Sequence, residues 1–237
     1  PMNKFTATAH QFLGIYERQS NHFTESINHF RELEKVAENN EQAKDARKNI
    51  MQLSVKTGDI NSASSYANLI LKKDKDDTQL VNEANLILGR ASLVSGNNDI
   101  AMDYFQSIRK LKSEMGAEAR YSIALIHHRK GEYKKCEKAI FDLVDEMPSY
   151  DHWLARGFIL LADNYLKLDN VFQAKQTLQS VIDNHEGEEL RNLAIQKLEA
   201  INAGNVVPTL TPLPEEDIQL NSNPNENNLF DTPENNN

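Results

Sequence analysis

The sequence contains only one cysteine, Cys136, among 237 residues. One thiol excludes an internal disulfide and cannot supply a four-ligand zinc site by itself. No run of about 18 apolar residues is present, so no membrane-spanning helix is encoded, and residues 1–10 lack the apolar core of a signal peptide. The motifs HExxH and GxSxG and a glycine-rich phosphate loop are also missing. We therefore expect no catalytic residues, no metal site and no cofactor.

Clusters of basic residues are missing as well. The chain has 26 Lys and Arg against 35 Asp and Glu, which gives a net charge of −9. Residues 205–237 hold six acids and no base, so six of the nine excess negative charges lie there. A nucleic-acid surface needs clustered Lys and Arg to neutralise phosphates. We do not expect nucleic acid as a partner.

The sequence does contain a repeat built on two columns of small residues. A turn residue is followed five positions later by a small one, in the pairs Asn21/Ser26, Gly58/Ala63, Gly96/Ala101, Gly131/Cys136 and Asp169/Ala174. Seven positions before each turn stand Gly14, Met51, Gly89, Ala124 and Ala162. Two antiparallel helices approach closely only where their facing side chains are small. The columns therefore predict five helical hairpins, with Gly89 against the helix of Ala101.

Large apolar residues surround these columns and indicate amphipathic helices. They stand one position before the first column and nine and twelve positions after each turn, as in Leu88, Phe105 and Ile108. A last amphipathic segment, 188–202, is typical of a helix that caps the final hairpin. Eleven helices are the expectation.

Two segments, LILGRASLVSGNNDIAMDYFQSI and LLADNYLKLDNVFQAKQTLQSVI, resemble the tetratricopeptide-repeat (TPR) signature. The resemblance implies an all-α, right-handed α-α superhelix, a solenoid of five helical hairpins plus a C-terminal capping helix within residues 1–203. The repeats would lie at about 7–40, 44–77, 82–115, 117–150 and 155–188, followed by the cap at 188–202. The first repeat departs from the signature because it lacks the turn glycine, and the second because Met51 replaces a small residue.

Residues 204–237 form an acidic tail rich in Asn and Pro. Such a segment buries too little apolar surface to offset the entropy of ordering it. Disorder is one expectation for the tail. The other is docking on a partner, or self-association through Leu210, Leu213, Ile218 and Leu220.

Single residues that invite a chemical role also have a structural interpretation. Cys136 occupies the small column, which favours a buried hydrophobic role over that of a nucleophile. His22, Glu25 and His29 share one side of a helix but lack a recognised metal-ligand spacing. Trp153 is expected in the core, although exposed aromatics can anchor partners.

In the TPR resemblance, the first helices of the repeats line a concave groove that cradles peptides. The implied groove residues are Lys48, Gln52, Arg90, Tyr121, Leu125, His128 and Asp163. Tyr121 and Arg90 are the preferred anchors, because interface hot spots are enriched in Tyr and Arg. The alternative is that Tyr121 packs between first helices, and its solvent exposure separates the two interpretations.

The segment EMPSYDHWLARGFILLADNYLKLDNVFQAKQTLQSVIDN resembles the closing repeats of large bacterial cell-envelope proteins of this family. That likeness implies a protein-binding scaffold in the periplasm or cell envelope. A cytoplasmic adaptor is the alternative within binding proteins, and a repeat-scaffolded enzyme is the rival from another class.

Overall fold

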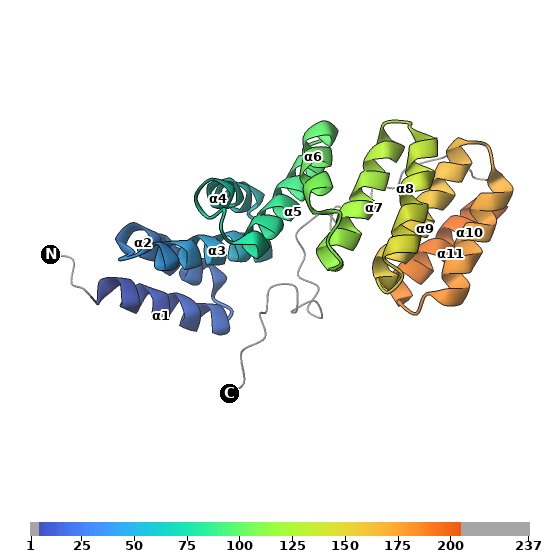
Figure 1. Ribbon diagram of the computed structural model, residues 1–237. Helices are drawn as coiled ribbons and strands as arrows, with labels where there is room; N and C mark the ends of the chain where they lie inside the picture. Colours follow the sequence, from blue (N-terminus) through green and yellow to red (C-terminus); the bar gives the residue numbers. More distant parts are fainter. Residues whose placement is uncertain (1–4, 205–237) are drawn as a thin grey trace. The chain divides into compact units, whose positions relative to one another are not determined.

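The computed structural model describes residues 5–204, which form eleven α-helices and contain no strand. An all-α fold of consecutive helical hairpins was predicted and is confirmed (Figure 1). The chain divides into two compact units between Asn97 and Asn98. No helix in the described range is long and apolar enough to cross a membrane. The predicted tail docking at Leu210, Leu213, Ile218 and Leu220 lies outside the described residues.

The first unit contains five helices, each packed on the next along the chain. They are α1 (Thr6–Gln19), α2 (Phe23–Val36), α3 (Asn40–Lys56), α4 (Ile60–Lys73) and α5 (Thr78–Val94). Phe30 and Leu33 of α2 are fully buried, and they pack in one apolar cluster with Ala46, Ile50 and Leu53 of α3. The second helix of one hairpin is thus joined to the first helix of the next.

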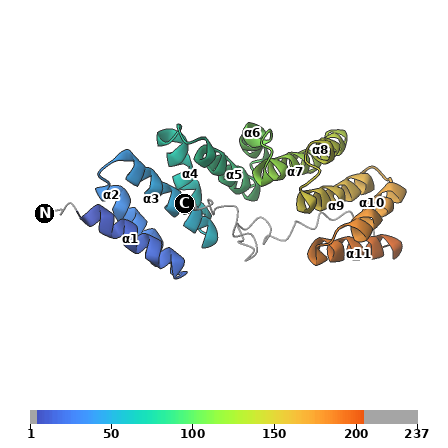
Figure 2. The ribbon, with the colours of Figure 1, turned by 60° about the horizontal axis from the view of Figure 1, so that its bottom comes forward.

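The second unit contains six helices. They are α6 (Asn98–Ile108), α7 (Glu114–Arg129), α8 (Tyr133–Glu146), α9 (Asp151–Lys167), α10 (Val171–Asn184) and α11 (Glu188–Asn202). Besides its sequence neighbours, α9 contacts α7 and α11, so these three helices are neighbours in space. Figure 2 shows α9, α10 and α11 side by side. The predicted cap, α11, packs on α10 through buried Leu190, Ala194 and Ile201.

All five predicted turn residues adopt the left-handed conformation. Their φ angles are 61° at Asn21, 72° at Gly58, 73° at Gly96, 72° at Gly131 and 56° at Asp169. Each is followed by a residue whose N–H reaches back to a carbonyl five positions earlier, as from His22 to Glu17 at 2.8 Å. This is the Schellman ending of a helix. Asn and Asp tolerate this conformation better than other residues with a Cβ, which is why a turn glycine is dispensable at Asn21 and Asp169.

The second small column is buried in every hairpin: Ser26, Ala63, Ala101, Cys136 and Ala174 are each 0% exposed. The first hairpin shows the close approach in detail. A Cβ placed on Gly14 would lie 3.0 Å from the ring of Phe30, and Ser26 Oγ donates a hydrogen bond to the Gly14 carbonyl at 2.7 Å. The expected contact of Gly89 with the helix of Ala101 joins residues of the two units and stays a prediction.

We expect Gly14→Val to destabilise the first unit, because the added methyl groups would collide with the buried ring of Phe30. Overpacking of this kind costs about 1–3 kcal/mol. Ala9→Val is the matched control, since Ala9 is exposed on the same helix and the change should cost less than about 1 kcal/mol through helix propensity. Denaturant unfolding measures both, and equal losses would show that the α1–α2 contact is looser than described.

Candidate functional site

On the second unit, the predicted groove residues lie where α7 meets α9. The Tyr121 ring lies 5.6 Å from the ring of Trp153 on α9, measured between centroids. The guanidinium of Arg156, also on α9, lies 5.2 Å from the centres of both rings. A guanidinium held against two aromatic faces is a favourable cation–π arrangement. This group joins the two helices through aromatic and cationic contacts.

Tyr121 is only 3% exposed, and Leu125 and His128 are 5% and 2% exposed. The expectation that Tyr121 is an exposed anchor is therefore wrong, and the packing interpretation holds for it. Trp153 is 9% exposed and belongs to the core, as expected. The physical reason is that side chains at these positions of α7 point toward α9. A long aromatic there is covered by the neighbouring first helix.

His128 makes polar contacts inside the α7–α9 contact. Its Nδ1 lies 3.2 Å from Asn164 Oδ1, and Asn164 Nδ2 donates to the carbonyl of Tyr133 at 3.0 Å. Burial lowers the pKa of His128, although Asn164 and the charge of Asp163 oppose this shift. The ring is therefore held in its neutral form more strongly than in the unfolded chain.

Asp163, the last predicted groove residue, is paired with Lys197 of α11, whose Nζ lies 2.9 and 3.0 Å from the two carboxylate oxygens. Lys197 stands seven positions before Gly204, whose φ is 70°. It thus occupies, on α11, the column that holds a small residue in four of the five hairpins. The lysine side chain instead joins α11 to α9 through Asp163.

On the first unit, three polar residues follow one another along the side of α3, at Lys48, Gln52 and Lys56. Residues four apart lie on the same face of a helix. Gln52 Nε2 donates a hydrogen bond to Glu83 of α5 at 2.9 Å, which ties α3 to α5. Burial raises the pKa of Glu83, while the bond from Gln52 and the charge of Lys48 act in the opposite direction. Arg90, partly exposed, lies two helical turns farther along α5.

A small pocket of about 250 Å³ opens beside Gln52. Its walls include the cations Arg18 and Lys56, the polar Gln19 and Asn21, and the ring of Phe23. Lys56 Nζ lies 5.4 Å from the centre of the Phe23 ring, and Arg18 Nη1 donates to Asn49 at 3.2 Å. Among the described residues, no acidic side chain lines this pocket. The four-residue spacing of Lys48, Gln52 and Lys56 shows in the sequence that they share one side of α3. Arg18 of α1 lies near them only because the chain folds.

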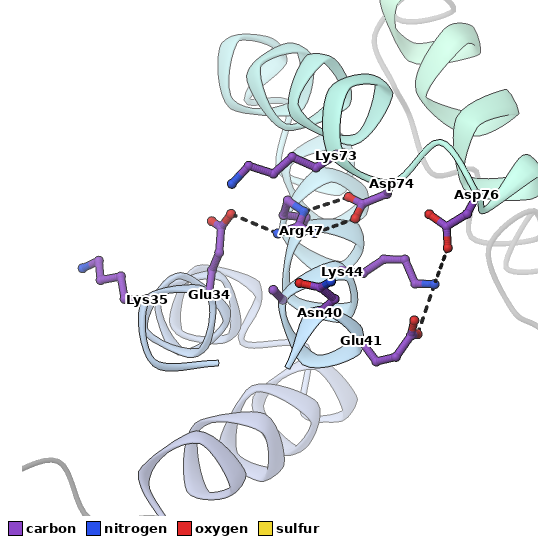
Figure 3. Close-up of a pocket in the computed structure, with 10 residues that line it drawn as sticks. Glu34, Lys35, Asn40, Glu41, Lys44, Arg47, Lys73, Asp74 and Asp76 are labelled. Carbon is purple, nitrogen blue, oxygen red and sulfur yellow. Dashed lines mark hydrogen bonds and ion pairs between the residues drawn. The ribbon is translucent and has the colours of Figure 1, made fainter. Parts of the chain in front are cut away.

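The larger pocket of the first unit, about 670 Å³, lies where α2, α3 and the end of α4 meet (Figure 3). Arg47, 5% exposed, stands at its base. Its Nε and Nη2 donate to the two oxygens of Asp74 at 2.8 and 2.5 Å, and Nη1 lies 3.7 Å from Glu34. The Asp74 carboxylate raises the pKa of Arg47. The guanidinium therefore already has two carboxylate partners.

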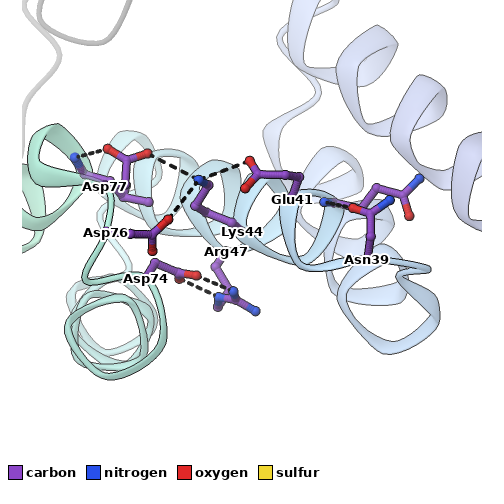
Figure 4. Close-up of polar contacts among 9 residues, drawn as sticks. Asn39, Glu41, Lys44, Arg47, Asp74, Asp76 and Asp77 are labelled. Atoms are coloured by element: carbon purple, nitrogen blue, oxygen red, sulfur yellow. Dashed lines mark hydrogen bonds and ion pairs between the residues drawn. The ribbon is translucent and has the colours of Figure 1, made fainter.

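Beside Arg47, Lys44 lies among three further carboxylates (Figure 4). Its Nζ is 3.1 Å from Glu41 and 3.9 Å from both Asp76 and Asp77. Asp77 also caps α5 by accepting a hydrogen bond from the N–H of Leu80 at 3.0 Å. Because cations and anions are matched within this pocket, we interpret it as the joint between the first two hairpins and α5. The sequence analysis missed it, because the two ends of an α2–α3–α4 ion cluster are 40 residues apart.

The side chains that the sequence analysis considered for catalysis or metal binding are buried or bonded to other residues. Cys136 is fully buried, and burial raises its pKa to about 12, so it is no nucleophile at neutral pH. His22 Nδ1 lies 2.7 Å from Glu17, whereas His29 Nδ1 lies 3.2 Å from His10. The three candidate ligands His22, Glu25 and His29 thus do not converge: the two histidines face different partners.

Comparison with solved structures places this architecture among helical-repeat proteins of TPR-like fold. The structure of MamA protein matches with a TM-score of 0.61 at 19% identity, over 89% of this chain and 100% of that one. The TPR domain of P58(IPK) matches with a TM-score of 0.38 and 13% identity, over 85% of this chain and 57% of that one. Rap protein complexed with Competence and Sporulation Factor gives 0.37 and 13%, over 88% and 78%. No protein-family model and no curated protein matches the sequence. At this identity, the likeness to MamA shows the fold alone.

The lowered pKa of His128 predicts that the stability of the folded chain depends on pH. Because its folded pKa is depressed, protonation favours the unfolded chain, and stability should fall as pH drops below the ordinary value of 6.5. We expect His128→Gln to lose less stability than the parent between pH 7 and 5. Urea unfolding at several pH values measures this. The control is His127→Gln, whose partner is Glu132. If the pH dependence of the unfolding free energy is the same in His128→Gln as in the parent, the assignment to His128 is wrong.

Removing Arg47 should cost far more than removing an exposed cation. Arg47→Met leaves Asp74, which is 4% exposed, buried without its partner, and breaking such a pair costs about 3–5 kcal/mol. The exposed pair Lys138–Asp142 is the control; Lys138→Met should cost less than about 1 kcal/mol. Chemical denaturation compares the two variants. In a double-mutant cycle, Arg47→Met with Asp74→Leu should cost much less stability than the sum of the two single substitutions, because the double variant leaves no unpaired buried charge. Losses that simply add would argue against the joint.

Proposed function

We propose that the chain is a non-catalytic protein-interaction scaffold, and that its first unit binds an acidic extended segment of a partner. The binding face is formed by Lys48 and Lys56 of α3, with Arg90 of α5, and continues into the small pocket at Arg18. Gln52, which is 6% exposed, lies between the two lysines and holds α3 to Glu83 of α5. One observation carries the proposal. In a chain of net charge −9, a pocket whose described lining holds two cations and no acid adjoins a row of basic and amide side chains.

Two acids of the first unit that lie next in sequence or space to these cations, Glu83 and Glu17, are already engaged. Glu83 accepts the hydrogen bond of Gln52 and is 3% exposed. Glu17 lies 2.7 Å from His22. The exposed cations can therefore attract an acidic ligand, because complementary charge steers association and selects partners.

The predicted groove residues of the second unit have a different role in this proposal. Tyr121, Leu125 and His128 are buried, so we assign them to shaping the α7–α9 surface rather than to anchoring a ligand. Asp163 is bound to Lys197, and a partner would meet this pair as a neutral unit. A Tyr121→Ala substitution would therefore disturb the packing of α7 on α9, so a loss of partner binding in that variant would not identify Tyr121 as an anchor.

The cellular setting forms part of the proposal and rests on the resemblance of the closing repeats to bacterial cell-envelope proteins. A cytoplasmic adaptor is the alternative. Fractionation of the source cell with an antibody against the chain distinguishes them: recovery with the envelope fraction supports the first, and recovery only with the cytosol overturns it.

We expect reversal of the two lysines on α3, Lys48→Glu with Lys56→Glu, to weaken partner capture at least tenfold, which is about 1.4 kcal/mol. The chain is immobilised and partners are captured from the source cell, then quantified by mass spectrometry against the parent. Capture by the parent should weaken as salt rises, because exposed charges are screened.

The matched control is Lys72→Glu with Lys110→Glu, which makes the same change in net charge at exposed lysines outside this face. It should capture partners like the parent. Both double variants must melt like the parent. If both lose capture equally, only net charge matters and the face is not the site. A parent that binds a single-stranded DNA oligonucleotide as tightly as an acidic peptide would favour a nucleic-acid surface and overturn the proposal.

A further inference from the structure

The outer side of α1 is an apolar surface. Phe5 at its start, with Phe12, Leu13 and Tyr16, is 63%, 70%, 44% and 63% exposed. Ala9, between them, is exposed too. Residues 5–16 contain no Asp, Glu, Lys or Arg, in a chain that is 26% charged. Contiguous exposed apolar side chains without charges are typical of the centre of a protein interface.

The same positions are covered in the later hairpins. Counted back from each turn residue, Ala9 corresponds to Ala46, Ala84, Ala119 and Gly157, and all four are buried. Phe12 corresponds to Asn49, Ile87, Ser122 and Leu160, which are 1–6% exposed. Tyr16 corresponds to Leu53, Ala91, Ile126 and Asn164, of which only Ala91 is more than marginally exposed. The exposed side of α1 is thus a repeat-stacking surface.

Two of the later hairpins show which side chains cover this surface. Ala46 and Leu53 of α3 share a core cluster with Phe30 and Leu33 of α2. A Cβ on Gly157 of α9 would lie 3.4 Å from Leu143 and 3.5 Å from Ile140, both on α8. In each case, the second helix of the preceding hairpin lays aliphatic or aromatic side chains, three residues apart, over the small residue.

We propose that the exposed side of α1 binds the amphipathic second helix of a helical hairpin of this same repeat type, carried by a partner. The ligand helix would place aliphatic residues spaced i, i+3 over Ala9, as Ile140 and Leu143 lie over Gly157. Phe12 and Tyr16, which follow Ala9 along the same side of α1, would be buried beside them. This surface is separate from the basic face of α3, and neither proposal depends on the other.

A second copy of the chain offers no such helix within the described residues. The second helices α2, α4, α6, α8 and α10 each pack on the helix that follows. The last described helix, α11, stands in the first-helix position of the repeat, with Lys197 seven residues before Gly204, so it is not the second helix of a hairpin. Symmetric pairing of two α1 helices is the remaining route to self-association. Three aromatics per copy, each about two-thirds exposed, would bury about 800 Å² in total, in the range of weak contacts.

The test supplies the proposed occupant from the chain's own repeats. Residues 114–152, which carry α7 and α8, are placed directly before Phe5 in the full chain. The turn at the copied Gly131 then precedes Asn21 by 38 residues, as Gly131 precedes Asp169. A Phe12→Cys substitution reports burial through maleimide labelling, because the natural thiol of Cys136 is 0% exposed. We expect labelling at least tenfold slower in the extended chain than in the parent.

Two variants keep the result interpretable. Ser65→Cys, at an exposed position of α4, should label equally fast in both chains. Ala9→Glu should leave the melting of the parent unchanged, because Ala9 is exposed there, and should restore fast labelling of Cys at position 12 in the extended chain by blocking the approach. Equal labelling of that thiol in the parent and the extended chain overturns the proposal. Protection in the parent that grows with protein concentration, with a dimer in sedimentation, would assign the surface to a second copy and overturn it too.

Discussion

The close approach of two helices within each hairpin is the constraint on which the rest of this structure depends. A left-handed residue reverses the chain, and a buried small residue five positions later lets the second helix lie against the first. In the first hairpin the approach is so close that the ring of Phe30 fills the space where Gly14 would carry a Cβ. Once the two helices are this close, the remaining side of each first helix must face either the preceding hairpin or the neighbouring first helices. That division determines which residues are available to a partner.

Polar contacts between hairpins then fix the position of each first helix. Arg47 of the second hairpin lies 3.7 Å from Glu34 of the first, and Gln52 joins α3 to α5 through Glu83. In the second unit, Asn164 links His128 to Tyr133, so a helix of one hairpin is held by both helices of another. Buried polar groups are costly unless their partners are correctly placed. These contacts therefore favour one register between neighbouring hairpins, in addition to the stabilisation that apolar burial gives.

The sequence alone predicts the hairpins well, because the residues that form them are local. Gly58, Gly96 and Gly131 each stand five positions before a buried small residue, so spacing is enough to find them. Asn21 and Asp169 show that the rule depends on tolerance of positive φ rather than on glycine itself. The candidate site was harder to predict. Tyr121 lies on the predicted face, but whether it is exposed depends on Trp153 and Arg156 of the next hairpin. The pairing of Arg47 with Asp74, 27 residues away, depends likewise on where one helix ends relative to another.

The two ends of the described chain differ in a way that bears on function. Repeat stacks need ends that keep their outer faces soluble, which is the usual task of capping helices. At one end, α11 packs on α10 and is joined to α9 by the ion pair between Lys197 and Asp163. At the other end, Phe12 and Tyr16 of α1 occupy positions that later hairpins bury and are left 70% and 63% exposed. Apolar side chains at an uncapped end gain free energy only when another surface covers them, at about 25 cal/mol for each Å². The apolar side of α1 is therefore a surface where covering by a further hairpin of this repeat type would be favourable.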